Sequence, residues 1–225
     1  KTGLVKQQEI YDKYVRRAKE RVVVIISDSF RFEVGQTLLK RLMEDEKCTA
    51  SMDAMQSVLP SYTRFGMSAL LPHRKLSMSD DYSVLVDGKI CDNLNSREQV
   101  LQSFVPNSRT VQFDDIKTMK IAELKEIFSG QEVVYVYHNQ IDARGDKLNT
   151  ENEVFTACEE AVEEIHTMIK RLTSANNIRF IITADHGFIY KRDKLVESDK
   201  ISGFERENAF VGRRYVIAPE GIHAE

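Results

Sequence analysis

Three short runs of consecutive apolar residues divide the chain. The strongest is Val22 to Ile26, five β-branched residues in a row, and the pattern returns at Val133 to Tyr137 and at Phe180 to Ile182. Unbroken apolar runs of this length are typical of parallel strands that are covered on both faces. Between the runs, apolar residues recur at helical spacing over 31–45 and 151–173. Strands that alternate with helices predict an α/β fold, a doubly wound and mostly parallel sheet with helices on both faces.

Weaker patterns predict elements at the periphery of this sheet. Asp87-Gly88 between two apolar stretches is a two-residue turn signal, so 82–91 is expected to form a small β-hairpin excursion. Ser61 is a candidate cap for a helix that Pro72 ends. The other expected elements are an amphipathic helix over 5–20, helices over 96–104 and 117–128, a loop or hairpin over 191–200, and a short strand over 214–218.

Length and composition bound the class of protein. The 225 residues are expected to form a helical lead-in, 1–20, and one domain, 21–225, and the lack of a starting Met indicates a fragment of a longer protein. A formal net charge of -3 predicts no general attraction to nucleic acid. We expect no membrane span, because no apolar run approaches roughly 18 to 20 residues. Three scattered cysteines without a C-x-x-C pair indicate a reduced, cytoplasmic protein.

Acidic residues follow each of the three apolar runs. Asp28 follows the first, Asp142 and Asp146 follow the second, and Asp185 with His186 follows the third. Because the carboxyl ends of parallel strands share one edge of a sheet, these side chains are expected to converge on one crevice. Carboxylates with an imidazole suit zinc, manganese or magnesium, and an oxygen-rich set favours the harder ions. The alternatives are a helix cap for Asp28 and solvated loop acids for Asp142 and Asp146.

A hydroxyl group stands at the predicted start of the helix that ends at Pro72. Thr63 lies in its first turn, where free backbone N–H groups favour an anion. A neutral hydroxyl is a poor nucleophile, but coordination to a metal lowers its pKa and activates it. Thr63 is therefore the candidate nucleophile, with Ser57 and Ser61 as rivals. His138 ends the second apolar run and is either a partner of a metal ligand or a core histidine.

Four stretches of sequence together resemble a known family. They are Ile26-Ser-Asp-Ser-Phe-Arg-Phe-Glu33, Leu59-Pro-Ser-Tyr-Thr-Arg-Phe-Gly-Met-Ser-Ala-Leu-Leu-Pro72, Tyr137-His-Asn-Gln-Ile-Asp-Ala-Arg-Gly-Asp146 and Ile182-Thr-Ala-Asp-His-Gly-Phe188. Their order along the chain is similar to that of the alkaline phosphatase superfamily. Their residues resemble those of the PglZ family, the alkaline-phosphatase-like component of bacterial BREX phage-defence systems. The resemblance runs from about 21 to 218 and implies an alkaline-phosphatase-like sheet.

The resemblance also implies two metal sites. Asp28, Thr63, Asp185 and His186 would form the first. Asp142 and Asp146 would contribute to the second, where many superfamily members have His in place of Asp146. Those members take a further His from late in the chain, and His223 is the candidate here. Up to two divalent ions are implied, zinc first, with manganese or magnesium as alternatives.

The function implied is that of a metal-dependent phosphatase or phosphodiesterase acting in phage resistance. Its substrate would be a phosphate ester or phosphodiester, with nucleic acid or nucleotides as candidates, and its partners other BREX proteins. Arg31 and Arg144 lie beside proposed ligands and are candidates for binding substrate phosphate; pairing with local acids is the alternative. A second hypothesis is a catalytically weak metal-binding module that scaffolds or regulates a phage-defence complex, because fold resemblance does not ensure activity.

Overall fold

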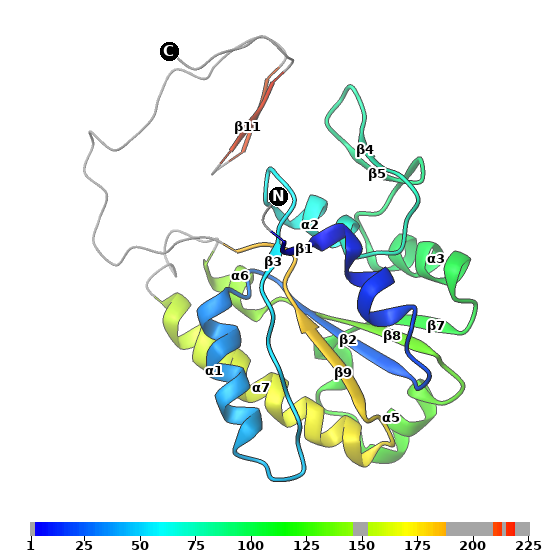
Figure 1. Cartoon of the computed structure of the whole chain (residues 1–225), viewed down its shortest axis with the longest axis vertical. Coiled ribbons are helices and arrows are strands. Elements are labelled where there is room, and N and C mark those ends of the chain that lie inside the picture. The colour runs from blue at the N-terminus through cyan, green and yellow to red at the C-terminus, as the bar shows by residue number, and fades with distance from the viewer. Residues whose placement is uncertain (1–2, 146–152, 188–208, 213–214, 219–225) are drawn as a thin grey trace.

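A four-stranded parallel sheet forms the centre of the computed structural model, which describes residues 3–145, 153–187, 209–212 and 215–218. The strand order is β7 (Ser108–Gln112), β8 (Val133–His138), β2 (Val22–Ser27) and β9 (Arg179–Thr183), and every pairing is parallel (Figure 1). The α/β fold predicted from the alternating pattern is therefore confirmed.

Strand β2 shows why the apolar run is unbroken. All six of its residues are buried, and successive side chains point to opposite faces of the sheet. Val23 and Ile25 join one hydrophobic cluster, whereas Val24 and Ile26 join another on the other face. Each face of the sheet therefore needs its own apolar cover.

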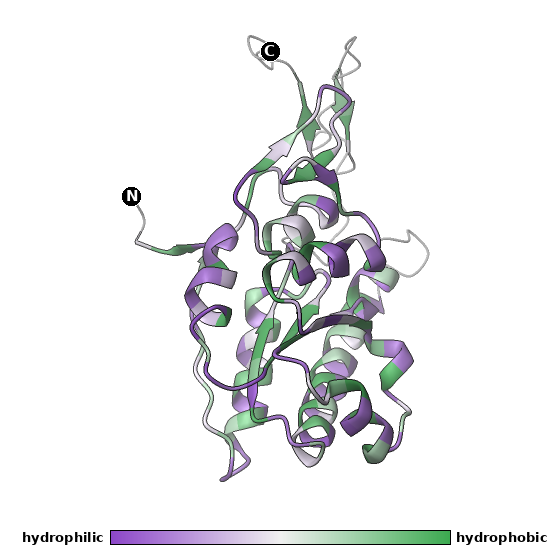
Figure 2. Cartoon of the chain, turned by 90° about the vertical axis from the view of Figure 1, so that its right-hand side faces the viewer, coloured by the Kyte–Doolittle hydropathy of each residue, from purple (hydrophilic) through white to green (hydrophobic). Residues whose placement is uncertain are grey.

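Helices supply both covers, as the sequence predicts. The first cluster is completed by α1 (Phe32–Met43), α4 (Phe113–Ile116), α5 (Ile121–Phe128) and α7 (Val154–Ser174). The second is completed by α2 (Thr63–Ala69) and α3 (Leu94–Phe104). The helices visible in Figure 2 carry both hydrophilic and hydrophobic residues, as expected for helices with one buried side.

Helix α7 follows its apolar periodicity closely. The predicted helix over 151–173 is observed as Val154–Ser174, with 151 and 152 outside the described residues. Its buried side contains the six residues that carry the periodicity, namely Val154, Cys158, Ala161, Ile165, Met168 and Leu172. The chain then returns to the sheet through Asn176, whose positive φ of 65° forms the turn before β9.

The sheet differs from the sequence analysis in two strands, one that was not predicted and one whose expected burial was wrong. β7 was not predicted, because its sequence Ser-Arg-Thr-Val-Gln carries too few apolar residues to read as a strand. β9 was expected to be fully buried, but its residues are half-buried or exposed, and it pairs on one side only among the described strands. Both strands lie at an edge of the described sheet, where burial is incomplete.

The start of the chain also differs from the expected amphipathic helix over 5–20. It forms the short strand β1 (Val5–Lys6), the 3-10 turn η1 (Gln7–Glu9) and the π-helical turn η2 (Tyr11–Val15). β1 pairs in parallel with β3 (Met55–Gln56), so contacts distant in sequence override the helical periodicity. The division between 1–20 and 21–225 stays a prediction.

The peripheral elements agree in part with the sequence pattern. β4 (Leu76–Met78), β5 (Val84–Val86) and β6 (Lys89–Ile90) form an antiparallel sheet, and Asp87 and Gly88 have the positive φ values of a two-residue hairpin turn. The strand expected over 214–218 is β11 (Val216–Ile217), paired with β10 (Phe210–Val211). Residues 191–200 lie outside the described residues. The described helices include no segment with the length and apolar character of a membrane span.

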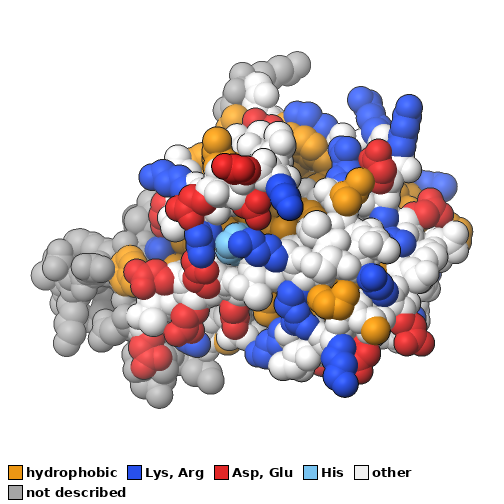
Figure 3. All heavy atoms as spheres, turned by 90° about the horizontal axis from the view of Figure 1, so that it is seen from below, with side chains coloured by type: hydrophobic (Ala, Val, Ile, Leu, Met, Phe, Trp, Pro, Cys, Tyr) orange, Lys and Arg blue, Asp and Glu red, His pale blue; other side chains and the backbone are white. Residues whose placement is uncertain are grey.

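The surface carries mixed charge. On the face that Figure 3 shows, the described basic and acidic side chains intermingle rather than separate into blocks of one sign. This mixture agrees with the formal net charge of -3. On that face, a broad electrostatic attraction to a polyanion has no structural basis.

Candidate metal centre

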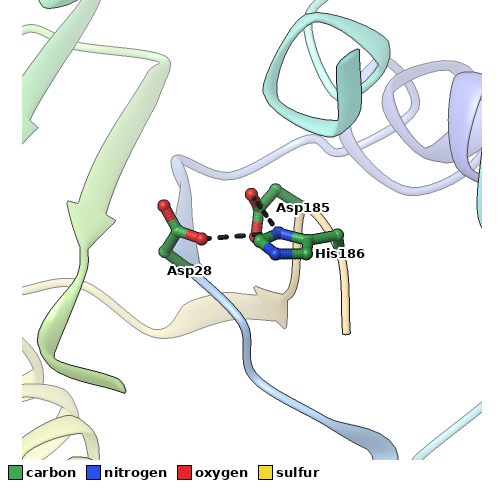
Figure 4. A group of neighbouring side chains, drawn as sticks. All are labelled: Asp28, Asp185 and His186. Carbon is green, nitrogen blue, oxygen red and sulfur yellow. Dashed lines mark hydrogen bonds and ion pairs between the residues drawn. The ribbon is translucent and has the colours of Figure 1, made fainter. Parts of the chain in front are cut away.

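Two neighbouring strands bring acidic residues together at their carboxyl ends. Strand β2 leads into Asp28, and β9 leads into Asp185 and His186. The two strands pair in parallel register up to Ile26 and Thr183, so both chains leave the sheet at the same edge. The parallel pairing therefore places residues far apart in sequence side by side (Figure 4).

The three side chains form a compact, buried cluster. Their candidate ligand atoms all lie within 4.8 Å of one another, and no side chain is more than 9% exposed. His186 Nδ1 lies 2.8 Å from Asp185 Oδ2 and 3.5 Å from Asp28 Oδ1. Two carboxylates and an imidazole at this spacing match the donor set of a divalent cation.

The electrostatics of the cluster also fit a cation. Burial, followed by the charges of Asp185 and Asp142, raises the pKa of Asp28 to about 9. The buried Oδ1 of Asp28 accepts no hydrogen bond from the described residues. A buried acceptor without a donor and carboxylates that repel one another are both stabilised by a positive ion. The residues present therefore fit the divalent metal that the family resemblance implies.

Ser29 connects this cluster to Asp142. It is fully buried and has a φ of 61°, which is uncommon for a residue other than glycine. Its N–H donates to Asp185 Oδ1 at 3.2 Å, and its hydroxyl donates to Asp142 Oδ1 at 2.8 Å. The same hydroxyl lies 3.2 Å from His186 Nε2. The sequence analysis assigned no role to Ser29, although it belongs to the polar segment Ser27-Asp28-Ser29 that follows the first apolar run.

Asp142 is the only member of the second proposed site among the described residues. It lies on the short helix α6 (Gln140–Gly145), which the sequence analysis did not predict. Its link through Ser29 and its effect on Asp28 place its carboxylate next to the buried cluster rather than in open solvent. Asp146 and His223, the other candidates for that site, lie outside the described residues.

Helix α2 packs directly on the residue that carries a candidate ligand. A Cβ built on Gly66 would lie 2.5 Å from the carbonyl carbon of Asp185 and closer still to the oxygen. The glycine is therefore required for this close approach. Thr63 is the first residue of α2, three residues before Gly66, so the two lie on neighbouring parts of one helix face. The packing brings the start of α2 toward the cluster.

The three candidate nucleophiles differ in their surroundings. Ser57 donates its hydroxyl to Gln7 Oε1 at 3.4 Å and to the carbonyl of Val58 at 3.2 Å. Thr63 and Ser61 are half-buried, and within the described part of the chain neither hydroxyl makes a hydrogen bond. Gln7, the partner of Ser57, is, after Ser29, a second residue to which the sequence analysis assigned no role.

The two arginines proposed to bind substrate each contact an acid. Arg31 is buried, and its Nε lies 2.8 Å from Glu33 Oε1. Arg144 Nη1 lies 2.6 Å from Glu160 Oε2. These are the local ion pairs that the sequence left as the alternative. Both acids are largely exposed, at 63% and 49%, so water competes for each pair.

A third arginine lies on the other face of the sheet. Arg97 of α3 stacks over the Tyr137 ring at 4.8 Å and donates its Nε to the carbonyl of Cys91 at 3.3 Å. Its positive charge opposes the rise in the pKa of Asp28. Arg97 therefore lies within electrostatic range of the cluster, on the face that α2 covers, and no motif in the sequence indicated it.

His138 is a buried histidine with both ring nitrogens occupied. Its Nδ1 lies 2.9 Å from Ser27 Oγ, and its Nε2 lies 3.0 Å from Glu164 Oε2. Its carbonyl accepts a hydrogen bond from the N–H of Asp28 at 2.7 Å. His138 therefore lies behind the cluster as a hydrogen-bonded core residue, one of the two interpretations that the sequence left open.

A family model and two curated proteins are similar to this chain. A family model described as the BREX system PglZ alkaline phosphatase-like domain matches residues 7–224. Alkaline phosphatase-like protein PglZ from Bacillus cereus (strain H3081.97) is 39% identical over 229 residues, which cover 99% of this chain and 27% of that protein. Alkaline phosphatase-like protein BrxZ from Escherichia coli O9:H4 (strain HS) is 34% identical over 206 residues, 88% of this chain and 24% of that protein. The chain spans about a quarter of the length of these curated relatives.

Proposed function

The chain belongs to the PglZ family of BREX alkaline phosphatase-like domains, and we propose that it is a metal-dependent phosphoric ester hydrolase domain that acts in phage resistance. The observation that carries the proposal is the buried cluster of Asp28, Asp185 and His186 beside the start of α2. A buried cluster of two carboxylates and an imidazole, close to the helix that begins with Thr63, suits chemistry on an anionic ester.

The candidate ligands would bind up to two divalent ions. Asp28, Asp185 and His186, with Thr63, would hold one divalent ion, zinc first and manganese or magnesium as alternatives. Asp142 would serve a second ion, together with Asp146 and His223. Bound ions supply Lewis-acid stabilisation of the phosphoryl oxygens and of the leaving oxygen.

Thr63 is the proposed nucleophile. Its Oγ forms a bond to phosphorus while the bond from phosphorus to the leaving oxygen breaks, and the hydroxyl proton passes to that oxygen. The products of this step are an alcohol and a threonine that carries a phosphoryl group, or a nucleotidyl group when the substrate is a phosphodiester. Water then attacks the same phosphorus, the bond from phosphorus to Thr63 Oγ breaks, and a proton of the water passes to that oxygen. This step restores the hydroxyl and releases inorganic phosphate or a phosphate monoester. The position of Thr63 one helical turn before Gly66, which touches Asp185, supports the choice over Ser57.

The substrate is proposed to be a phosphate ester or phosphodiester, with a nucleotide or nucleic acid as the candidate. Arg31 and Arg144 are proposed to bind its phosphate by exchanging their exposed partners Glu33 and Glu160 for the substrate oxygens. Other BREX proteins are the proposed partners, in the cytoplasm. This chain spans about a quarter of the length of its curated relatives, so the substrate and partners of the whole protein are also part of this proposal.

Hydrolysis of bis-p-nitrophenyl phosphate with added zinc or manganese tests the proposal. We expect turnover that a chelator abolishes and that Thr63→Ala lowers by about 10³-fold or more, since the nucleophile is lost. Ser61→Ala is the matched control, because Ser61 is half-buried like Thr63 and its hydroxyl makes no hydrogen bond in the described part of the chain, and it should stay within a few-fold of the parent. Equal losses in the two variants would contradict the assignment of Thr63.

Elemental analysis of the purified protein decides the metal part of the proposal. One to two divalent ions per chain after saturation are expected. Bound metal without turnover in the full-length protein would favour the second hypothesis, a metal-binding scaffold or regulatory module. Less than one ion per chain would refute the metal-dependent hydrolase altogether.

A further inference from the structure

The side chain of Gln7 lies between two segments that the candidate site depends on. Gln7 is fully buried, although its neighbours in η1, Gln8 and Glu9, are exposed. Its Nε2 donates to the carbonyls of Ala184 at 3.1 Å and Asp185 at 2.5 Å. A buried side chain at the very start of the chain therefore reaches the residues that end the sheet.

The carbonyl end of the same amide contacts the other segment. Gln7 Oε1 accepts a hydrogen bond from the N–H of Val58 at 3.1 Å and one from Ser57 Oγ at 3.4 Å. A side-chain amide has two N–H donors and two acceptor lone pairs. Both donors and one lone pair of Gln7 are used, and the other lone pair faces the Ser57 hydroxyl, whose single proton is shared with the carbonyl of Val58 at 3.2 Å. The Gln7 amide therefore bridges 184–185 and 57–58.

Backbone pairing places the bridge. β1 and β3 pair with Val5 opposite Met55 and Lys6 opposite Gln56, so Gln7 follows directly where the loop toward Thr63 begins. On its other side, the backbone of Asp185 packs against Gly66 of α2. Asp185 is therefore held between the Gln7 amide and α2, and its backbone cannot shift without disturbing one of them.

We propose that Gln7 is a positioning residue that sets the backbone of Asp185 and couples this metal ligand to the loop that leads into Thr63. The inference rests on the proposed function for its consequence, because it assigns Asp185 as a ligand. The bridge itself rests only on the four hydrogen bonds and the burial of Gln7. The two parts can therefore be tested separately.

Hydrogen–deuterium exchange in the metal-free full chain tests the bridge. Gln7→Met keeps the length of the side chain and removes all four hydrogen bonds, whereas Gln8→Met makes the same change at an exposed position. We expect amides of 183–187 and of 55–58 to exchange about ten-fold faster in Gln7→Met and as in the parent in Gln8→Met. Unchanged exchange at both segments would overturn the proposal.

A second variant keeps the test decisive if Gln7→Met does not fold. Gln7→Glu retains an oxygen that can accept from Val58 and Ser57, but it replaces the donor group that faces the carbonyls of Ala184 and Asp185. Exchange should then rise in 183–187 more than in 55–58. Equal changes at the two segments would refute the two-sided bridge.

Cobalt binding tests the consequence for the metal site. Co²⁺ reports coordination through its visible absorption spectrum, and we expect Gln7→Met to weaken its affinity by about 10- to 100-fold and to change the spectrum, as loss of a supporting contact does. Faster exchange with unchanged cobalt binding would refute the positioning role and leave a structural bridge. Failure of the parent to bind Co²⁺ would instead refute the proposed function, and the exchange data alone would then decide the bridge.

Discussion

Substitution of Gly66 by alanine is the sharpest probe of how the candidate site is assembled. A Cβ at this position would lie 2.5 Å from the carbonyl carbon of Asp185 and 3.0 Å from its Cα. Non-bonded carbon atoms ordinarily lie about 3.5 Å or more apart, so one of the two backbones must retreat by about 1 Å. The atoms that the added Cβ would meet belong to the backbone of Asp185 rather than to a flexible side chain, so no rotamer change can relieve the overlap.

The substitution changes two contributions to the free energy of unfolding in opposite directions, namely the helix propensity of residue 66 and its packing against Asp185. Alanine in a helix interior is favoured over glycine by about 1 kcal/mol in isolation. The added methyl group overpacks the contact with Asp185, which costs about 1–3 kcal/mol or more. The net result should be a loss of up to about 2 kcal/mol, or a fall in Tm of up to about 4–8 °C for a chain of this size. A displacement of about 1 Å should also reduce hydrolysis by about 10²-fold.

Gly35→Ala in α1 is the matched control. There the nearest atom to a built Cβ is Met52 Cε at 2.9 Å, the end of a flexible side chain that can move aside. We expect its Tm to equal or exceed that of the parent. Thermal unfolding and hydrolysis of bis-p-nitrophenyl phosphate measure both effects. A Gly66→Ala protein with the stability and activity of Gly35→Ala would refute the close packing of α2 on Asp185.

Two further predictions concern the buried cluster. Because the pKa of Asp28 is raised to about 9 from 3.8, the metal-free native state holds a proton that the unfolded state loses, so stability falls as pH rises between about 4 and 9. Urea unfolding with a chelator at pH 6 and pH 8 should show this fall, by up to about 1.4 kcal/mol per pH unit, and Asp28→Asn should flatten it; parallel slopes would contradict the cause. Ser29→Gly suits the positive φ but removes the hydroxyl that links Asp142 to His186. We expect its Tm to stay within a few degrees while divalent-metal affinity, measured by calorimetry, falls about ten-fold, and unchanged affinity would rule out this link.

The elements that could be predicted from sequence are those whose burial is visible in the pattern of apolar residues within the element itself. Both faces of β2 and β8 are covered, so all residues of these two strands are buried and most of them are apolar. α7 buries one side only, and its periodicity shows that side directly. In these cases the local pattern and the tertiary environment agree.

The elements that were missed depend on distant partners. β7 is a strand because it pairs with β8, although its own sequence is polar. The first residues of the chain leave the helical path because β1 pairs with β3. No window of neighbouring residues contains either partner.

The candidate site divides in the same way. Asp28, Asp185 and His186 could be named as candidate cation ligands without the fold, because each follows an apolar run that is typical of a strand. The contacts of Ser29 and Gln7 with this cluster, the packing of Gly66 on Asp185, and the pair of Arg31 with Glu33 became visible in the folded chain. Ligand chemistry belongs to single side chains, whereas hydrogen bonding and close packing depend on which backbone segments the parallel sheet brings together.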